Sequence, residues 1–205
     1  MTILEHGEKI ERQMRDLSEE LGKLRADEVD VDAIEERVLE LAKAWGRVQM
    51  AKALRRADSG ASEVDINGER WGNARATPHE YETVFGTVPL ERTVYQQSGR
   101  GRVAVPMDLR LGMVEGTYTP RVARIATRAL ANMPEHEAAE LLGEVGIATL
   151  SNSTIGRLGR AMAARYEQRR PVIAAAIREQ HAMSVPTTYG PLPGILLRSI
   201  PPPRG

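Results

Sequence analysis

Apolar residues near the N-terminus repeat at alternating steps of four and three. Between residues 8 and 25 the positions in this rhythm are Ile10, Met14, Leu17, Leu21 and Leu24, and later they are Ile34, Val38, Leu41, Trp45 and Val48. Such a 3.5-residue spacing is typical of helices that pair along one seam. The link over residues 26–30 is short, so the helices should fold back antiparallel, with Asp30 or Asp32 capping the second. The pattern predicts a helical hairpin over residues 1–57, with coiled-coil character.

Two helices alone bury little apolar surface, so residues 8–50 need a further partner. We consider two partners equally well supported by the pattern. One is the rest of the same chain, and the other is a second chain in a homo-oligomer.

Alternation with a period of two follows the turn-rich segment 58–62. Asn67-Gly68, the strongest hairpin signal in the chain, separates residues 64–66 from residues 70–71. A second hairpin is expected from residues 81–85 and 88–95 around Gly86-Thr87, and residues 103–105 follow a glycine-containing turn. These segments predict a small antiparallel sheet over residues 63–106.

From Thr119 onward the rhythm is helical again. Thr119-Pro120 is a cap followed by proline at the first helical position, and the apolar stripe after it consists of Val122, Ile125, Ala126 and Leu130. A second helix should open at Pro134 and run to about Leu142, where Gly143 and Gly146 break it. Ser151 or Ser153 should cap a third helix, which Pro171 kinks or restarts.

The fold class expected from these patterns is mainly α with a small antiparallel β-sheet (α+β). The helical hairpin 1–57 comes first, then the sheet region 63–106, and then a helical domain over residues 117–182. Residues 183–205 hold six of the 12 prolines and no periodic pattern, so we expect this tail to be disordered.

Within residues 117–182 the polar faces follow the pattern of a helix-turn-helix DNA reader. An Ala-Ala-x-Leu-Leu helix, a glycine-containing turn and a serine-capped helix succeed one another, although the connection exceeds the usual three to four residues. A helix N-terminus offers free amides to a phosphate, and guanidinium groups fit phosphates and guanine edges. The predicted DNA-binding residues are Arg121, Arg124, Arg128, Ser151, Ser153, Thr154, Arg157 and Arg160. The alternative is a three-helix packing unit with solvated arginines.

The charge of the chain is zero only on average. The 205 residues hold 28 Lys plus Arg and 28 Asp plus Glu, but residues 1–65 carry a net charge of −5 and residues 66–205 carry +5. All four lysines (Lys9, Lys23, Lys43 and Lys52) lie in the acidic part, so every later base is arginine. This distribution favours nucleic-acid binding by the second part, although a GC-rich genome also enriches arginine.

Other chemistries find little support in the sequence. The chain has no cysteine, which excludes disulfides, thiolate zinc sites and cysteine nucleophiles. Its four histidines are scattered without metal-ligand spacing, so we expect no catalytic and no metal-binding residues. No stretch approaches the roughly 20 apolar residues that span a bilayer, and the N-terminus lacks the order of a signal peptide. We therefore expect a cytoplasmic protein without a membrane partner.

Three blocks in order resemble bacterial insertion-sequence transposases of the Kra type. Residues 81–95 (YETVFGTVPLERTVY) are similar to that family's "T(L/V)FG.V.(V/L)ERT.Y" block. Residues 105–121 (VPMDLRLGMVEGTYTPR) resemble its "VP…R.G.VEG..TPR.AR" block, and residues 151–158 (SNSTIGRL), with the following Arg-Tyr-Glu, resemble its "S.S…RL" helix.

The resemblance implies a DDE-type recombinase, in which three carboxylates hold two divalent metals such as Mg²⁺ for strand cleavage and transfer. No Asp or Glu follows Glu179, so no catalytic residue is carried over and no cofactor is expected in this chain. The expectation is a truncated, catalytically inactive DNA-binding and multimerisation part with a frameshifted tail. Its partners would be the double-stranded DNA of the element ends and, through residues 8–50, another copy or a full-length transposase. The alternatives are a helical interaction protein that binds no DNA, or a pseudogene product without function.

Overall fold

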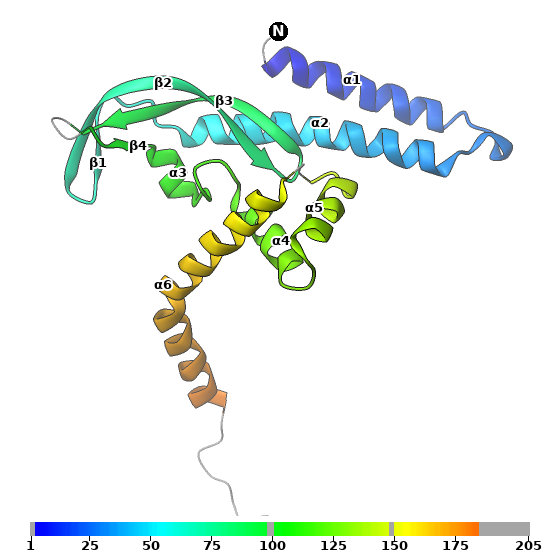
Figure 1. The fold of residues 1–205 in the computed structure, drawn as a ribbon. Coiled ribbons are helices and arrows are strands. Elements are labelled where there is room, and N and C mark those ends of the chain that lie inside the picture. Colours follow the sequence, from blue (N-terminus) through cyan, green and yellow to red (C-terminus); the bar gives the residue numbers. More distant parts are fainter. Residues whose placement is uncertain (1–2, 98–100, 148–149, 185–205) are drawn as a thin grey trace, which may run out of the picture. The chain divides into compact units, whose positions relative to one another are not determined.

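The structure is a computed structural model that describes residues 3–97, 101–147 and 150–184. The chain divides into two compact units, Met1–Ala163 and Ala164–Gly205. The elements that bear on function lie in the first unit (Figure 1). The expected α+β class is confirmed, because the described residues form helices together with a four-stranded antiparallel sheet.

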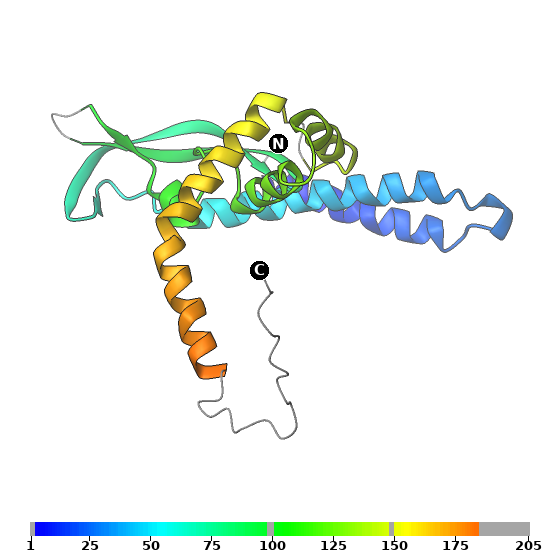
Figure 2. The ribbon, with the colours of Figure 1, turned by 60° about the horizontal axis from the view of Figure 1, so that its bottom comes forward.

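The N-terminal hairpin consists of α1 (Ile3–Leu21) and α2 (Val31–Ala57), joined by a link with the 3-10 turn η1 (Ala26–Glu28). Figures 1 and 2 both show the two helices side by side. Asp30 caps α2, its Oδ1 accepting from the Ala33 amide at 3.1 Å. Across the hairpin, Arg37 donates to both carboxylate oxygens of Glu20 at 2.7 Å. All four lysines of the chain lie in this hairpin.

The predicted seam of the hairpin is only partly buried. Ile10, Leu17 and Val48 are buried, whereas Met14, Val38 and Trp45 remain exposed. Leu24 lies beyond the end of α1, so the prediction that it continues the helix was wrong. The intrachain contact therefore uses one side of the seam and leaves apolar residues uncovered on the other.

The sheet has the order β1 (Val64–Ile66), β2 (Glu69–Thr83), β3 (Gly86–Gln96) and β4 (Val103–Ala104). Asn67 and Gly68 form the first turn with positive φ angles of 57° and 80°, as the Asn-Gly signal predicts. The second turn consists of Val84 and Phe85, since Thr83 pairs with Gly86. The prediction that Gly86-Thr87 forms this turn was wrong: Gly86, at φ 97°, closes the turn and begins β3.

A six-residue helix, α3 (Pro106–Leu111), follows the sheet and was not predicted. Pro106 occupies its first turn, and Gly112 ends it in the left-handed conformation at φ 67°, which glycine adopts without strain. Met107 of α3 and Met113 pack with Tyr81, Val88, Leu90, Ala51 and Leu54 in one core. This core joins α2, the sheet and α3.

A second core joins α4 (Pro120–Leu130), α5 (Glu135–Glu144) and the start of α6 (Asn152–Ser184). We call α4, α5 and residues 152–163 the helical cluster. Its buried residues include Val122, Ala123, Ala126, Ala138, Leu142, Ile155 and Leu158. The three predicted helices are thus present, and their apolar stripes face one another.

Three boundaries in this region differ from the expectation. Gly143 lies inside α5, and the break comes at Gly146, whose φ is 61°. Pro171 lies within the continuous α6 and starts no new helix. Residues 183–184 close α6, while the rest of the predicted disordered tail, residues 185–205, lies outside the described residues. None of the described helices combines the length and the apolar character needed to cross a bilayer.

Candidate nucleic-acid interface

The sequence of α4 positions three arginines on one side of the helix. Val122, Ala123 and Ala126 turn into the core, and at 100° per residue Arg121, Arg124 and Arg128 occupy the opposite side within an arc of about 60°. All three are exposed. Thr119 fixes the start of the helix, its Oγ1 accepting from the Val122 amide. We call this surface the α4 arginine face.

The α4 arginine face carries charge without internal compensation. None of its three guanidinium groups forms an ion pair with another residue in the described parts of the chain, and α4 itself contains no acidic residue. Arg121 and Arg124 are three residues apart, and Arg124 and Arg128 are four apart, which are spacings at which like charges repel. Arg121 also lies in the first turn, where the helix dipole disfavours a cation. An anion at this face would relieve both effects.

The predicted hydroxyl residues form the N-terminus of α6. Ser151 is the cap: its Oγ accepts from the Thr154 amide at 3.3 Å, and its carbonyl accepts from the Ile155 amide at 3.0 Å. The hydroxyls of Ser153 and Thr154 lie 3.0 and 2.9 Å from the same Oγ. The expected cap is therefore present, and Ser151 and Ser153 remain exposed at a helix N-terminus.

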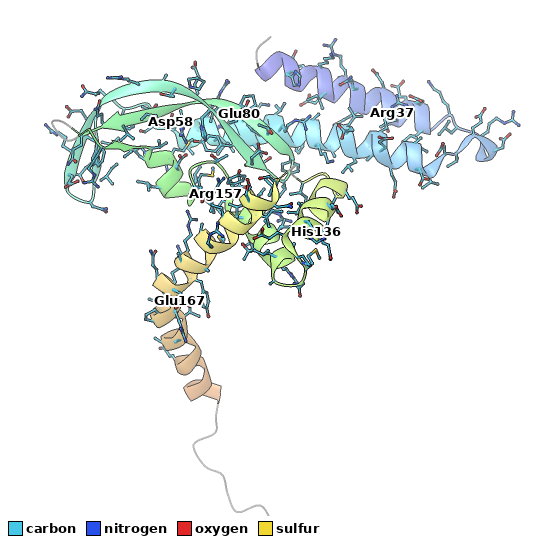
Figure 3. The ribbon with its side chains drawn as sticks, viewed as in Figure 1. Arg37, Asp58, Glu80, His136, Arg157 and Glu167 are labelled. Carbon is cyan, nitrogen blue, oxygen red and sulfur yellow. The ribbon has the colours of Figure 1, made fainter. Side chains whose placement is uncertain are left out.

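Arg157 has an internal partner that sequence reasoning missed. Its Nε donates to Glu115 Oε2 in an ion pair, and this partner raises the pKa of the Arg157 guanidinium above its usual value. Glu115 belongs to a tight turn in which Glu115 and Gly116 have φ angles of 51° and 68°. Arg157, labelled in Figure 3, therefore fastens α6 to this turn, and a purely DNA-facing role does not describe it.

Arg160 differs from Arg157, although both lie on the outward side of α6. Ile155 and Leu158 face the core, and the spacing places Ser153, Arg157 and Arg160 on the other side. Arg160 is exposed and forms no ion pair with the described residues. Of the two predicted α6 arginines, Arg160 is the one available to a phosphate.

The middle helix of the helical cluster has the opposite charge. Glu137, Glu140 and Glu144 lie on the side of α5 away from buried Ala138 and Leu142, and all are exposed. His136, labelled on α5 in Figure 3, is exposed too. An approaching polyanion would be repelled by α5, so within the helical cluster the outward sides of α4 and α6 suit it better.

The two glycines of α6 lie against side chains of the neighbouring helices. A Cβ on Gly156 would lie 2.4 Å from Glu135 Oε1, and one on Gly159 would lie 2.6 Å from Leu130 Cδ2. Both contacts involve the ends of side chains at the junction of α4 and α5. The sequence "S.S.IGRL.R" therefore combines a cap, a packing glycine and an outward arginine.

A buried polar cluster lies elsewhere in the first unit and was not predicted. We call Tyr81, Arg92, Asp108 and Gly116 the polar node. Asp108 accepts from the Tyr81 hydroxyl and from Arg92 Nη1, each at 2.5 Å, and Arg92 Nη1 also donates to the Gly116 carbonyl at 3.0 Å. Burial, followed by the hydrogen bond to Asp108, raises the pKa of Tyr81 above its usual value. Arg92 thus joins β3, α3 and the turn at Gly116.

Other residues of the block 81–95 have structural contacts of the same kind. The Thr93 amide and hydroxyl donate to Asp58 Oδ2 at 2.7 and 2.9 Å, and the Tyr95 hydroxyl donates to the Ala61 carbonyl at 2.7 Å. Phe85 lies against Gly46, and its carbonyl accepts from Arg47 Nη1 at 3.0 Å. These motif residues hold the hairpin and the sheet together, so their contacts are structural.

Among the described residues, neither metal-ligand groups nor clefts point to a second site. Within residues 3–97, 101–147 and 150–184, no group of three or more His, Asp or Glu side chains is placed to hold a metal ion. A shallow depression of about 680 Å³ is lined by residues that include Arg55, His79, Glu91 and Thr117. His79 Nε2 lies 2.8 Å from the Gly116 carbonyl, so its ring is already engaged.

No protein-family model, curated protein or solved structure matches this chain. The functional argument therefore depends on the residues and geometry described above.

Proposed function

We propose that the chain binds double-stranded DNA through the α4 arginine face and the outward side of the first turns of α6. Arg121, Arg124 and Arg128 carry this proposal, because they are exposed on one helix and form no ion pair with the residues that the structure describes. When the three guanidinium groups bind DNA phosphates, counterions are released from the DNA and the repulsion among the guanidinium groups is relieved. Arg160 and the hydroxyls of Ser151 and Ser153 add contacts at the N-terminus of α6.

The two helices would have different tasks in such a complex. The three arginines of α4 carry the larger charge, so they supply affinity and orientation through the phosphates. Arg160, on the helix that follows the turn, takes the place of a base-reading residue of a helix-turn-helix protein. The acidic side of α5 faces away from DNA in this arrangement.

The resemblance to Kra-type transposases supports the ends of an insertion sequence as the target. In this proposal the chain supplies DNA recognition and contributes no catalytic carboxylate. Sequence preference is tested with two labelled duplexes, one taken from the DNA flanking the coding sequence and one with the same bases scrambled. Tighter binding to the flanking duplex supports element-end recognition, and equal binding reduces the proposal to DNA binding without sequence preference.

A charge-removal experiment tests the interface itself. We expect Arg121→Gln/Arg124→Gln to weaken duplex binding, as measured by fluorescence anisotropy. The negative slope of log K against log salt should become shallower by about 1.8, or about 0.9 for each lost phosphate contact. The matched control is Arg12→Gln/Arg15→Gln, an exposed pair with the same spacing on α1. The two double variants have equal net charge, so equal losses would contradict the proposed interface.

The second candidate function is that of a helical interaction protein that binds no DNA. The exposed apolar side chains of the hairpin, Met14, Val38 and Trp45, favour it as a specific observation. It predicts that the unaltered chain leaves duplex anisotropy unchanged even at low salt, a result that would eliminate DNA binding.

A further inference from the structure

We propose that α2 carries a self-complementary stripe through which two copies of the chain pair antiparallel about a two-fold axis. The stripe consists of two series with seven-residue spacing: Val31, Val38, Trp45 and Lys52, and Glu35, Ala42, Gln49 and Arg56. The inference is independent of DNA binding, because it uses a different part of the first unit.

The apolar members of the stripe are uncovered within the chain. Val31, Val38 and Trp45 are 61%, 45% and 42% exposed. Val48, which lies about 60° around the helix from Trp45, is only 3% exposed. On a helix, positions seven apart differ in direction by only about 20°, so these three form a nearly straight line. A tryptophan and two valines in line on a solvent-facing side are typical of a helix that has a partner.

Intrachain packing explains the rest of α2 and leaves the stripe unexplained. Arg37 and Val48 lie toward α1, as the Arg37–Glu20 pair and the closeness of Val48 to Gly7 show, and the Lys52 ammonium group at the end of the stripe also lies near Gly7. Gly46 and Arg47 lie toward Phe85. The rest of the stripe occupies the remaining side, and within the described residues its charged members Glu35, Lys52 and Arg56 form no ion pair.

The charges of the stripe indicate which partner it fits. Its acidic residue, Glu35, lies toward the N-terminal end of α2, and its basic residues, Lys52 and Arg56, lie at the C-terminal end. A second α2 running antiparallel brings each end against its opposite charge. A parallel copy would instead place Glu35 against Glu35 and Lys52 against Lys52, which is unfavourable.

The antiparallel register also matches side-chain sizes. In antiparallel pairs, one heptad series packs against the other. Pairing Glu35 with Lys52 of a second copy places Trp45 opposite the small Ala42, and Val38 opposite Gln49. The two-fold axis then passes between residues 43 and 44, so each contact occurs twice, as an isologous interface requires. A second copy therefore satisfies both the apolar line and its charged ends.

The first test is the mass of the full chain in solution by light scattering and sedimentation. We expect twice the 22.6 kDa of one chain, and we expect Val38→Glu/Trp45→Glu to give single chains with unchanged helical circular dichroism. Leu109→Glu is the control, since Leu109 is 65% exposed on α3, away from the stripe. A monomeric unaltered chain, or a double variant that stays dimeric, would overturn the proposal.

A charge exchange tests the register. Glu35→Lys and Lys52→Glu should each shift the dimer toward monomers, because each places like charges together at both ends of the stripe. The double variant Glu35→Lys/Lys52→Glu should restore the dimer, because the exchanged charges again face each other. Failure of the double variant to regain mass would contradict antiparallel pairing in this register.

A third arm distinguishes a second copy from the C-terminal part of the same chain. Residues 195–197 are Ile-Leu-Leu, an apolar run outside the described residues. The full-length variant Leu196→Asp/Leu197→Asp should remain dimeric if a second copy covers the stripe. If the unaltered chain is a monomer and this variant dimerises, the run is the occupant and the proposal is wrong.

Discussion

Arginine has opposite surroundings in the polar node and on the α4 arginine face. In the polar node Arg92 is largely buried, and its guanidinium contacts Asp108, the Tyr81 hydroxyl and the Gly116 carbonyl. On the α4 arginine face, Arg121, Arg124 and Arg128 are exposed and have no ion-pair partner in the described parts. A buried arginine that is paired with a carboxylate specifies structure, whereas an exposed and mutually repelling group is free to bind an external anion.

The same contrast divides the residues of the two sequence blocks 81–95 and 105–121. Arg92, Thr93 and Tyr95 of the first block are engaged in internal hydrogen bonds, whereas Arg121, at the end of the second block, points outward. One motif thus combines residues that maintain the fold with a residue that is exposed to solvent. Substitutions in the two groups should therefore change different measurements.

The largest expected effect comes from Asp108→Ala. The change leaves Arg92 buried without its carboxylate, which typically costs about 3–5 kcal/mol of unfolding free energy. Urea denaturation followed by circular dichroism measures this loss, with exposed Asp16→Ala on α1 as the control. Arg121→Gln/Arg124→Gln should leave the same midpoint within error, and a comparable loss in that variant would erase the contrast between the two regions.

A smaller loss is expected when a methyl group is added to Gly46. The new Cβ would lie 2.4 Å from the Phe85 ring, and overpacking of this kind costs about 1–3 kcal/mol. Gly156→Ala is the matched change in the helical cluster, where the nearest atom is the movable carboxylate end of Glu135. Helix propensity should make Gly156→Ala neutral or stabilising by up to about 1 kcal/mol. Equal destabilisation by both would show that the two interfaces are equally rigid.

Alkaline pH should weaken the polar node selectively. The folded-state pKa of Tyr81 is raised by burial and by the hydrogen bond to Asp108, so its contribution is fully present below the unfolded pKa of about 10. Above that pH the unfolded tyrosine ionises while the folded one keeps its proton, and stability falls by up to about 1.4 kcal/mol per pH unit.

The measurement is the urea midpoint from pH 9 to pH 11, compared with Tyr81→Phe. The phenylalanine variant has no ionisable group at this position, so its midpoint should decline less steeply. Identical slopes for the two proteins would mean that Tyr81 titrates normally in the folded chain.

The smallest effect is expected from Glu115→Gln. The substitution removes the partner of Arg157 and releases an arginine on the same side of α6 as Arg160. One further phosphate contact should steepen the salt dependence of DNA binding by about 0.9, with little change in thermal stability because the pair is exposed. An unchanged slope would place Arg157 outside the DNA-binding surface.

Local signals predicted most elements of the fold. Thr119-Pro120, Ser151 and Asn67-Gly68 each determine a cap or turn through atoms within a few residues, and all three occur where the pattern indicates. The misplaced second turn followed from reading Gly86 as its centre, although a glycine with positive φ can also close a turn. Helix α3 was missed because six residues hold too little periodicity, despite Pro106 and Gly112 at its ends.

The candidate site was less predictable because its state depends on distant partners. Helical spacing correctly places Arg121, Arg124 and Arg128 on one side of α4, away from its buried residues. Nothing local to Arg157 indicates that Glu115, 42 residues away, holds it. The same applies to Arg92 and Asp108, which lie 16 residues apart and meet only when β3 and α3 pack together.

The lysines of the N-terminal hairpin give the chain a chemically distinct end. Lys9, Lys23, Lys43 and Lys52 are the only side-chain primary amines among the 205 residues, and all precede the sheet. Acylating reagents and a lysine-specific protease can therefore act on side chains of the hairpin alone. The helices α4 and α6 contain no lysine and retain their charge under the same treatment, so an amine-directed label separates the chemistry of the hairpin from that of the arginine-bearing helices.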